Sequence, residues 1–407
     1  MLVVAQHFHK RITLALAAVA VVACAGRTDR PVLVSAEDGD PVRGGTSCRV
    51  VEHQVLVRGV EVAAPALAST REDEVFVAWV ARETSSRWIA LRHLTPALEL
   101  DGPERALGHD EEGMPIAPAV AACGGTVWVA WQRQEPRGGD SIRLAVLTSG
   151  DLETGEAVTA GRGTDPAIAC LDETAALTWT LRHDGVQDVF LAWVDARGRL
   201  GEPIRLGGET DVADTPAVAC GDRRCGVAWT DARDVRSDIY FGSIATGEGL
   251  VAPVRISTHD PVASGAGEAY APAIATTDGL TYLIAWHDTR TVAESQIYTA
   301  TVAESGAVGP DSRISRSPAP STAAAVAACE AGNAVAWRDR RDGPPEVLFA
   351  AVDRRGRRAS PSIALGEEAD DASAPAIACG PRSTFAVTWT SARDDGGGLE
   401  LALVDCR

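Results

Sequence analysis

Residues 215–257, TPAVACGDRRCGVAWTDARDVRSDIYFGSIATGEGLVAPVRIS, contain short apolar runs separated by polar turns. The sequence predicts four strands, which are Ala217–Cys220, Cys225–Trp229, Ile239–Ile244 and Val254–Ile256. Pro216 stands at the head of the first run, where a strand tolerates a missing N–H. Short strands bounded by turn residues at such intervals indicate all-β structure.

The same pattern recurs along the chain with a period of about 50 residues. Its tryptophan is found at Trp79, Trp131, Trp179, Trp229, Trp286, Trp337 and Trp389. A proline precedes six of these tryptophans at an almost constant distance, at Pro65, Pro118, Pro166, Pro216, Pro272 and Pro375, and Ala324 takes that place in the remaining unit. Four strands in each repeat of this length predict the blades of a β-propeller.

We therefore expect an all-β, seven-bladed propeller of four-stranded antiparallel blades over residues 48–407. The blades are expected to start near residues 64, 117, 165, 215, 271, 323 and 374. The repeated tryptophan is interpreted as a packing wedge between neighbouring blades, because a buried indole contributes a large apolar area.

The seventh unit ends after three strands, at Leu399–Asp405. We expect the fourth strand of this blade to come from the N-terminal side, at Val55–Val62, because borrowing a strand closes the ring and removes an exposed edge. Cys48 precedes the borrowed strand and Cys406 follows the strand that it would pair with. Antiparallel pairing would bring these two cysteines together, which predicts a disulfide that closes the ring.

The N-terminus has the features of a targeting signal. Lys10 and Arg11 precede an apolar run at 12–23, which is too short for an ordinary membrane span and suits a signal peptide. The end of this run, Val21–Cys24, resembles a bacterial lipobox, in which the cysteine is lipidated. Ordinary signal cleavage, which still exports the chain, is the alternative.

These features predict a signal peptide at 1–23, a lipidated Cys24, and a flexible tether over 24–47, which is rich in Gly, Pro and Asp. The expected location is the cell envelope, with lipid anchoring to a bacterial membrane, the outer membrane being favoured, or else secretion. Membrane contact is expected through the N-terminal lipid only.

The chain is acidic, with a formal net charge of −18. Removal of 1–23 takes away two positive charges and no negative charge, which leaves −20. This charge argues against a nucleic-acid partner and against direct adhesion to anionic phospholipid.

Export makes the remaining cysteines candidates for disulfides. Cys220 and Cys225 flank a four-residue turn, which predicts a bridge within that hairpin. Four other cysteines end the first strand of their units, at Cys123, Cys170, Cys329 and Cys379. Bridges between adjacent blades and free buried thiols both fit these four, because a bridge requires Cα atoms within about 7 Å.

A Trp-x-Asp-x-Arg motif ends the second strand of units four to six. Its charged residues are Asp231, Arg233, Asp288, Arg290, Asp339 and Arg341. In a propeller, the loop after the second strand and the loop that leads into the blade emerge on the same face, which we call the loop face. One interpretation is a staple, in which the Asp accepts N–H groups of its own turn and pairs with the Arg. The other is a ligand site on the loop face.

Two His-Asp pairs of the fifth unit and its entry loop are expected on the same face. His259 and Asp260 lie in the loop before it, and His287 and Asp288 end its second strand. Two imidazoles and two carboxylates together are suitable ligands for zinc or another divalent metal. The spacing does not fix a ligand geometry, so we expect no cofactor, with a divalent metal at these residues as the alternative.

The repeated phrases A-P-A-I-A, V-A-W-x-D-x-R, D-I-Y and V-D-x-x-G resemble secreted β-propeller lipoproteins that are abundant in myxobacteria and related bacteria. More distantly, residues 64–407 are similar to the sialidase-type propeller superfamily. The chain lacks the Ser-x-Asp-x-Gly-x-x-Trp boxes and the Phe-Arg-Ile-Pro start of sialidases. The resemblance therefore implies an architecture and no particular activity.

No Gly-x-Ser-x-Gly, His-Glu-x-x-His, P-loop or calcium-loop motif is present. We expect a non-catalytic binding or scaffold module that binds an envelope protein or polysaccharide through its rigid loop face. The alternative is a hydrolase or lyase that acts on polysaccharide, with its site on the loop face of blades 4–6. The sequence does not indicate an oligomeric state.

Overall fold

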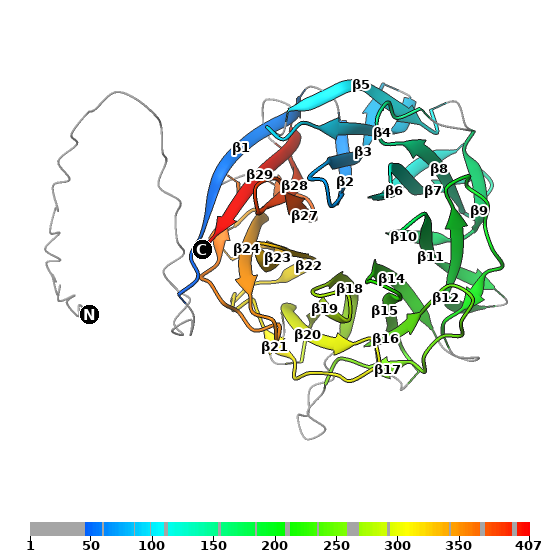
Figure 1. The fold of residues 1–407 in the computed structure, drawn as a ribbon. Coiled ribbons are helices and arrows are strands. Elements are labelled where there is room, and N and C mark those ends of the chain that lie inside the picture. The colour runs from blue at the N-terminus through cyan, green and yellow to red at the C-terminus, as the bar shows by residue number, and fades with distance from the viewer. Residues whose placement is uncertain are drawn as a thin grey trace, which may run out of the picture. The chain divides into compact units, whose positions relative to one another are not determined.

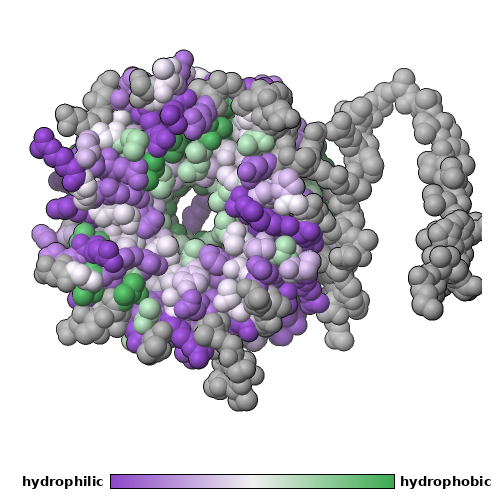
Figure 2. Space-filling view, turned by 180° about the vertical axis from the view of Figure 1, so that it is seen from behind, coloured by the Kyte–Doolittle hydropathy of each residue, from purple (hydrophilic) through white to green (hydrophobic). Residues whose placement is uncertain are grey.

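The computed structural model shows a ring of seven β-sheets around an axial opening (Figures 1 and 2). The structure describes residues 45–407 apart from 59–60, 85, 98, 110–112, 154–155, 184, 208–211, 234–235, 259–267, 291–293, 342, 367–370 and 393–396. These residues form strands and no helix, which confirms the predicted all-β propeller. No described helix could therefore span a membrane. The predicted signal peptide and Cys24 lie outside the described residues.

Each blade has antiparallel strands that follow one another outward from the axis. Blade 1 contains β2 (Glu61–Ser69), β3 (Val75–Glu83), β4 (Ser86–Leu94) and β5 (Leu100–Leu107). Blade 2 contains β6 (Met114–Cys123), β7 (Thr126–Gln134), β8 (Ser141–Thr148) and β9 (Val158–Arg162). Blade 3 contains β10 (Thr164–Leu171), β11 (Thr174–His183), β12 (Val186–Asp195) and β13 (Ile204–Arg205).

The next three blades repeat this order with very short outer strands. Blade 4 contains β14 (Ala213–Cys220), β15 (Cys225–Asp231), β16 (Asp238–Ile244) and β17 (Val254–Arg255). Blade 5 contains β18 (Ala269–Thr276), β19 (Thr281–Asp288), β20 (Gln296–Ala303) and β21 (Ser312–Arg313). Blade 6 contains β22 (Ser321–Cys329), β23 (Gly332–Asp339), β24 (Glu346–Val352) and β25 (Ile363–Ala364).

Blade 7 combines both ends of the described chain. Its inner strands are β26 (Asp371–Ala372), β27 (Ala376–Gly380), β28 (Thr384–Ala392) and β29 (Gly398–Cys406), and β1 (Cys48–Arg58) is its outermost strand. The predicted closure by an N-terminal strand is therefore present, but the predicted bounds, Val55–Val62, are wrong. The register runs from Cys48 opposite Cys406 to Arg58 opposite Gly398, because Glu61 onward already belongs to blade 1.

The innermost strands begin before the repeated proline and not at it. In β14, the pairing with β15 shifts register between Asp214 and Ala217, and Thr215 has a positive φ of 47°. The residues at the corresponding bulges of blades 1, 2, 3, 5 and 6 are Ala64, Ala117, Asp165, Ala271 and Ala323, with φ between 47° and 53°. Because proline has no N–H, it fits where the ladder is interrupted, and so it marks a β-bulge.

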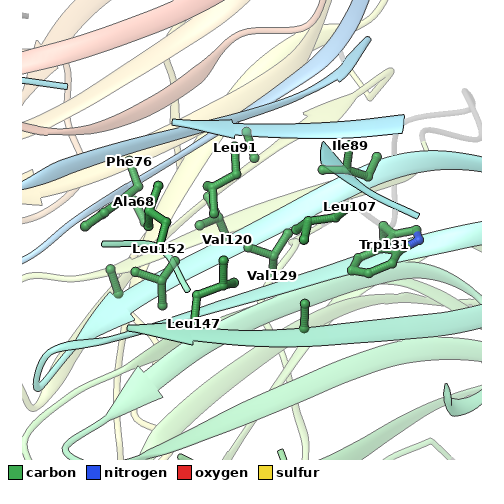
Figure 3. Close-up of a cluster of buried hydrophobic side chains, with 14 of the residues drawn as sticks. Ala68, Phe76, Ile89, Leu91, Leu107, Val120, Val129, Trp131, Leu147 and Leu152 are labelled. Atoms are coloured by element: carbon green, nitrogen blue, oxygen red, sulfur yellow. The ribbon is translucent and has the colours of Figure 1, made fainter. Parts of the chain in front are cut away.

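The core consists of seven apolar clusters, each shared by two adjacent blades. Figure 3 shows the cluster between blades 1 and 2, where Phe76 and Leu91 of blade 1 pack with Val129 and Trp131 of blade 2. All seven repeated tryptophans are at most 2% exposed, so they are packing residues as expected.

Four disulfides join described cysteines. The ring-closing bridge Cys48–Cys406 and the hairpin bridge Cys220–Cys225 are both formed. The four cysteines whose pairing was left open form bridges between adjacent blades, Cys123–Cys170 and Cys329–Cys379, with Cα separations of 6.3 and 5.5 Å. Four disulfides indicate an extracellular or envelope location, because the cytoplasm keeps thiols reduced.

Candidate functional site

The charged residues of the Trp-x-Asp-x-Arg motif form a staple within each blade. In blade 5, Asp288 accepts hydrogen bonds from the Trp286 indole N–H (3.0 Å), the Arg290 backbone N–H (2.8 Å) and Arg290 Nε (2.9 Å). The Asp288 carboxylate is fully buried. Its oxygens are therefore used to hold the turn and to satisfy the indole.

Blades 4 and 6 repeat this geometry. Asp231 accepts from the Trp229 indole N–H at 2.9 Å and from the Arg233 backbone N–H at 2.9 Å. Asp339 accepts from the corresponding donors of Trp337 at 3.1 Å and Arg341 at 3.0 Å. Both carboxylates are fully buried. The six predicted site residues are thus brought together as three separate pairs.

The arginines of blades 4 and 5 are covered as well as paired. The Arg233 guanidinium lies 4.2 Å from the centre of the Tyr240 ring, and that of Arg290 lies 4.4 Å from the centre of the Tyr298 ring. Arg290 also forms an ion pair with Asp311. Cation–π contact and ion pairing together fix these side chains.

The tryptophans of the other blades show why the Asp is present. The indole nitrogens of Trp79, Trp131, Trp179 and Trp389 are buried and have no hydrogen-bond partner in the described part of the chain. These blades have Ala81, Arg133, Leu181 and Ser391 in the place of the Asp. The staple Asp is therefore the acceptor that a buried indole N–H otherwise lacks.

Blade 7 has a different arrangement at this level. Ser391 donates to the buried Glu400 carboxylate at 2.6 Å, and His53 Nε2 lies 3.0 Å from its other oxygen. The His53 ring stacks on Trp389 with centroids 5.6 Å apart. His53 belongs to β1, so the borrowed strand supplies a polar contact to the blade that it completes.

The proposed metal ligands are only partly described. His259 and Asp260 lie outside the described residues, and the oxygens of Asp288 are used by the staple. His287 Nδ1 is buried without a hydrogen-bond partner among the described residues, and burial lowers the pKa of this imidazole. Across the described residues, no group of three or more potential metal ligands is found. His287 is thus the one described member with a free ligand atom.

A polar group of residues lies at the bulges of blades 3–5, and we call it the polar arc. It consists of Thr164, Asp165, Asp214, Thr215, Thr230, Glu268, Tyr270 and His287. In blades 1 and 2, the bulge residue and the residue before it are all apolar, at Ala63, Ala64, Ile116 and Ala117. These positions are therefore apolar in blades 1 and 2, whereas each of blades 3–5 has at least one polar residue there.

Hydrogen bonds link the polar arc across blades. Asp214 accepts from Gln187 Nε2 of blade 3 at 3.1 Å and from the Thr215 hydroxyl at 3.2 Å. The Thr230 hydroxyl bonds to Thr215 at 2.7 Å and accepts from the Ala271 backbone N–H of blade 5 at 3.1 Å. The bulges of blades 4 and 5 are thus joined to one another, and Gln187 ties blade 3 to the bulge of blade 4.

Burial and like charges perturb the ionisable groups of the arc. Burial raises the pKa of Asp214, with further contributions from the charges of Asp165 and Asp231. Burial also raises the pKa of Tyr270, whose hydroxyl donates to the Glu268 carboxylate. The Tyr270 ring lies 5.7 Å from that of His287. The arc can therefore offer a carboxyl with a raised pKa, a phenol, and an imidazole whose pKa is lowered.

A hollow of about 380 Å³ adjoins the arc on the side of blades 2 and 3. Its lining is Gly139, Asp140, Arg162, Gly163, Thr164, Thr180, Leu181, Arg182 and Gln187. Gln187 lines the hollow and also bonds to Asp214, so hollow and arc are contiguous. Together they present hydrogen-bonding groups of both charges, which could bind a polar ligand.

The sequence did not identify the polar arc. Asp214 and Tyr270 occupy the same place, two residues before the repeated proline, and Thr164 has this place in blade 3. A polar residue two positions before the proline indicates a site residue only when the proline is known to mark a bulge on the loop face.

No protein-family model matches the chain, and no curated protein matches it. A solved protein of unknown function from Dyadobacter fermentans is similar over 88% of this chain and 99% of its own, with 10% identity and a TM-score of 0.53. A neuraminidase-like protein of subtype N10 from A/little yellow-shouldered bat/Guatemala/060/2010 covers 73% and 95%, with 9% identity and a TM-score of 0.49. Trypanosoma rangeli sialidase covers 89% of this chain and 59% of its own, with 10% identity and a TM-score of 0.44. At 10% identity, the likeness to the Dyadobacter fermentans protein extends to the fold alone, and the two weaker likenesses support no conclusion.

Proposed function

We propose that this protein is an exported, lipid-anchored module of the cell envelope that binds an envelope polysaccharide or protein without catalysis. The binding site is the polar arc together with the adjoining hollow of about 380 Å³. Lipid attachment at Cys24 holds the ring at a bacterial membrane, with the outer membrane favoured.

The observation that carries this proposal is how the loop-face carboxylates are used. Asp231, Asp288 and Asp339 are fully buried and bonded within staples, so they are unsuitable as catalytic groups or as ligand contacts. The arc, by contrast, keeps Asp165 exposed and Asp214 and Tyr270 partly exposed. A rigid rim with accessible polar groups suits recognition.

The proposal is tested by binding of the purified full chain to polysaccharide fractions and proteins from the envelope. Asp214→Asn removes a charge from the arc and should weaken binding about tenfold, as loss of a charged hydrogen bond does. Asp172→Asn is the matched control, because Asp172 is exposed in the opposite turn of blade 3 and its left-handed φ of 53° suits Asn. Equal affinities of both variants and the wild type would exclude the arc as the site.

A hydrolase is the second candidate, and the raised pKa of Asp214 favours it. A carboxyl that keeps its proton to higher pH is suited to act as a general acid. Glu268 and Asp165 are the carboxylates available to work with it. For this candidate, the catalytic residues would lie in the polar arc of blades 3–5, and not in the staples of blades 4–6 as expected from the sequence. Formation of new reducing ends, lost in Asp214→Asn, would establish it.

A further inference from the structure

A second hollow, of about 300 Å³, lies beside the strands that close the ring. Its lining is Arg49, Val51, Glu52, Arg382, Thr384, Leu403, Asp405 and Arg407. Three arginines lie together with two carboxylate side chains in this hollow, in a chain whose net charge is −18. Salt screens exposed charges beyond about 8–10 Å, so a bound anion would meet chiefly the groups of the hollow itself.

The three arginines of this hollow have more N–H donors than its carboxylates can accept. Arg407 Nε lies 3.0 Å and Arg49 Nη2 lies 3.5 Å from the same oxygen of Asp405. The side chains of Arg49 and Arg407 are 67% and 81% exposed. Arg382 has no hydrogen bond or ion pair with another described residue. Because the two carboxylates of the hollow cannot accept from all the donors of three guanidinium groups, N–H donors remain for an anion.

The backbone holds Arg382 in an unfavourable conformation. Arg382 has a φ of 58° and Ser383 a φ of 55°, in the hairpin turn between β27 and β28. Such turns favour Asn and Gly, since other residues are strained in the left-handed region. Strain of this kind is concentrated at functional positions. The turn thus has an arginine where Asn or Gly would adopt the backbone conformation more readily.

The N-terminal segment leaves the ring at this hollow. The Ser47 backbone N–H donates to the Arg407 carbonyl at 2.7 Å, and the Arg407 N–H donates to the Ser47 carbonyl at 2.9 Å. In the proposed function, the residues between Cys24 and Ser47 tether this point to the membrane. A tether this short gives a millimolar effective concentration, so even weak binding to the membrane surface would be populated.

We propose that the hollow binds the phosphate groups of anionic lipid headgroups and so turns the clasp of blade 7 toward the membrane. The membrane part rests on the proposed anchor, whereas the phosphate chemistry rests on the arginines, whose forked donors match phosphate oxygens. The negative net charge of the chain argues against direct adhesion to anionic phospholipid. A net charge, however, does not show where the arginines lie on the surface. Inorganic phosphate offers the same chemistry, so the test separates the two sources.

The test is co-sedimentation of the full, unlipidated chain with phosphatidylcholine vesicles that contain or lack phosphatidylglycerol. Arg382→Asn relieves the strained turn and should raise thermal stability, yet it should weaken binding to the anionic vesicles about fivefold. Arg223→Asn is the control, because Arg223 is exposed in the corresponding turn of blade 4. The N-terminal segment is common to all variants, so its contribution cancels. Equal binding of the two variants would overturn the proposal.

Inorganic phosphate, compared with chloride at equal ionic strength, is the second arm. Competition by phosphate for the anionic vesicles, absent in Arg382→Asn, supports the proposal. Stabilisation of the wild type by phosphate without any preference for anionic vesicles would identify a free phosphate site and overturn the membrane assignment. Lipid labelling of the wild type and Cys24→Ser in the native cell tests the anchor independently. Failure of the lipid anchor can therefore be distinguished from failure of phosphate binding by the hollow.

Discussion

At the scale of single residues, the loop face is organised around the indole N–H of the repeated tryptophan. In blades 4–6, an aspartate two residues later accepts that N–H, while the same carboxylate holds the following turn and an arginine. In blade 5, the three donors converge on Asp288, which has no exposure. A buried charge is tolerated when it is paired and hydrogen-bonded in this way.

Replacing Asp288 tests the staple against the ligand-site interpretation. Asp288→Ala leaves the Trp286 N–H and the buried Arg290 without their acceptor, so the free energy of unfolding should fall by about 3–5 kcal/mol. Asp353→Ala, in an exposed turn that its carboxylate also caps, should cost about 1 kcal/mol. Urea unfolding measures both. A stable Asp288→Ala protein that has lost a ligand would identify a binding residue instead.

Asp339 should make stability depend on acid. Burial alone would raise its pKa, but the hydrogen bond and the charge of Arg341, with hydrogen bonds from Ser321 and Trp337, outweigh burial and leave the pKa below its ordinary value. A carboxyl group whose pKa is lower in the folded state stabilises the fold above the unfolded-state pKa of about 3.8. This contribution is lost as the pH falls through the lower folded-state pKa. Asp339→Asn should therefore be less stable at neutral pH and should lose less on acidification. Parallel urea midpoints from neutral pH downward measure the difference.

Asp214 should behave in the opposite way. Its pKa is raised, mainly by burial, so the folded state holds the proton more tightly than the unfolded state does. Stability then falls as the pH rises from about 3.8 through the folded-state pKa. Asp214→Asn should be more stable than the wild type at neutral pH, and equally stable in acid. A gain in stability together with a loss of binding would mark Asp214 as a functional residue. Lower stability at neutral pH would contradict this.

At the scale of elements, the period of the tryptophans predicted the number of blades, and the cysteines predicted how the ring closes. The start of each innermost strand was not predictable in the same way. A left-handed residue before proline is encoded as alanine, threonine or aspartate in this chain, and alanine has no preference for that conformation. The misplaced C-terminal bound of the borrowed strand follows from this, because residues 61–62 were assigned to the wrong blade.

The same bulge explains which part of the site was predictable. The staple residues lie at fixed positions after a recognisable tryptophan, so the motif revealed both the residues and their partners. Asp214 and Tyr270 lie just before a bulge that the sequence did not reveal, and Gln187 joins them from another blade. Contacts between blades depend on which strands become neighbours, and a single repeat does not contain that information.

The disulfides should differ in their effect on stability. Cys48–Cys406 closes a loop of 358 residues, whereas Cys220–Cys225 spans five. In the chain-entropy model, the first contributes about 6 kcal/mol and the second roughly 2 kcal/mol. Replacing both cysteines of a pair by serine should therefore lower the unfolding midpoint more for the ring-closing pair. Urea titrations of the two double variants make the comparison, and equal losses would mean that the packing of β1 alone closes the ring.

At the scale of the whole molecule, the ring separates two tasks. Seven apolar interfaces, the ring-closing disulfide and two disulfides between adjacent blades keep the blades in place. The polar arc gathers at the loop ends of blades 3–5, and the arginine-lined hollow lies at the clasp of blade 7, where the N-terminal segment leaves. A propeller held at the membrane by its clasp would leave the polar arc available to an envelope partner.

The most direct test of the central claim is to incubate the purified chain with envelope polysaccharides and to measure retention and new reducing ends in the same samples. For a non-catalytic binding module, we expect the protein to retain one polysaccharide fraction saturably and to form no reducing ends above the blank. Retention should be weaker in Asp214→Asn and unchanged in Asp172→Asn. Reducing ends that accumulate with time in the wild type and not in Asp214→Asn would contradict a non-catalytic module and make the protein a hydrolase.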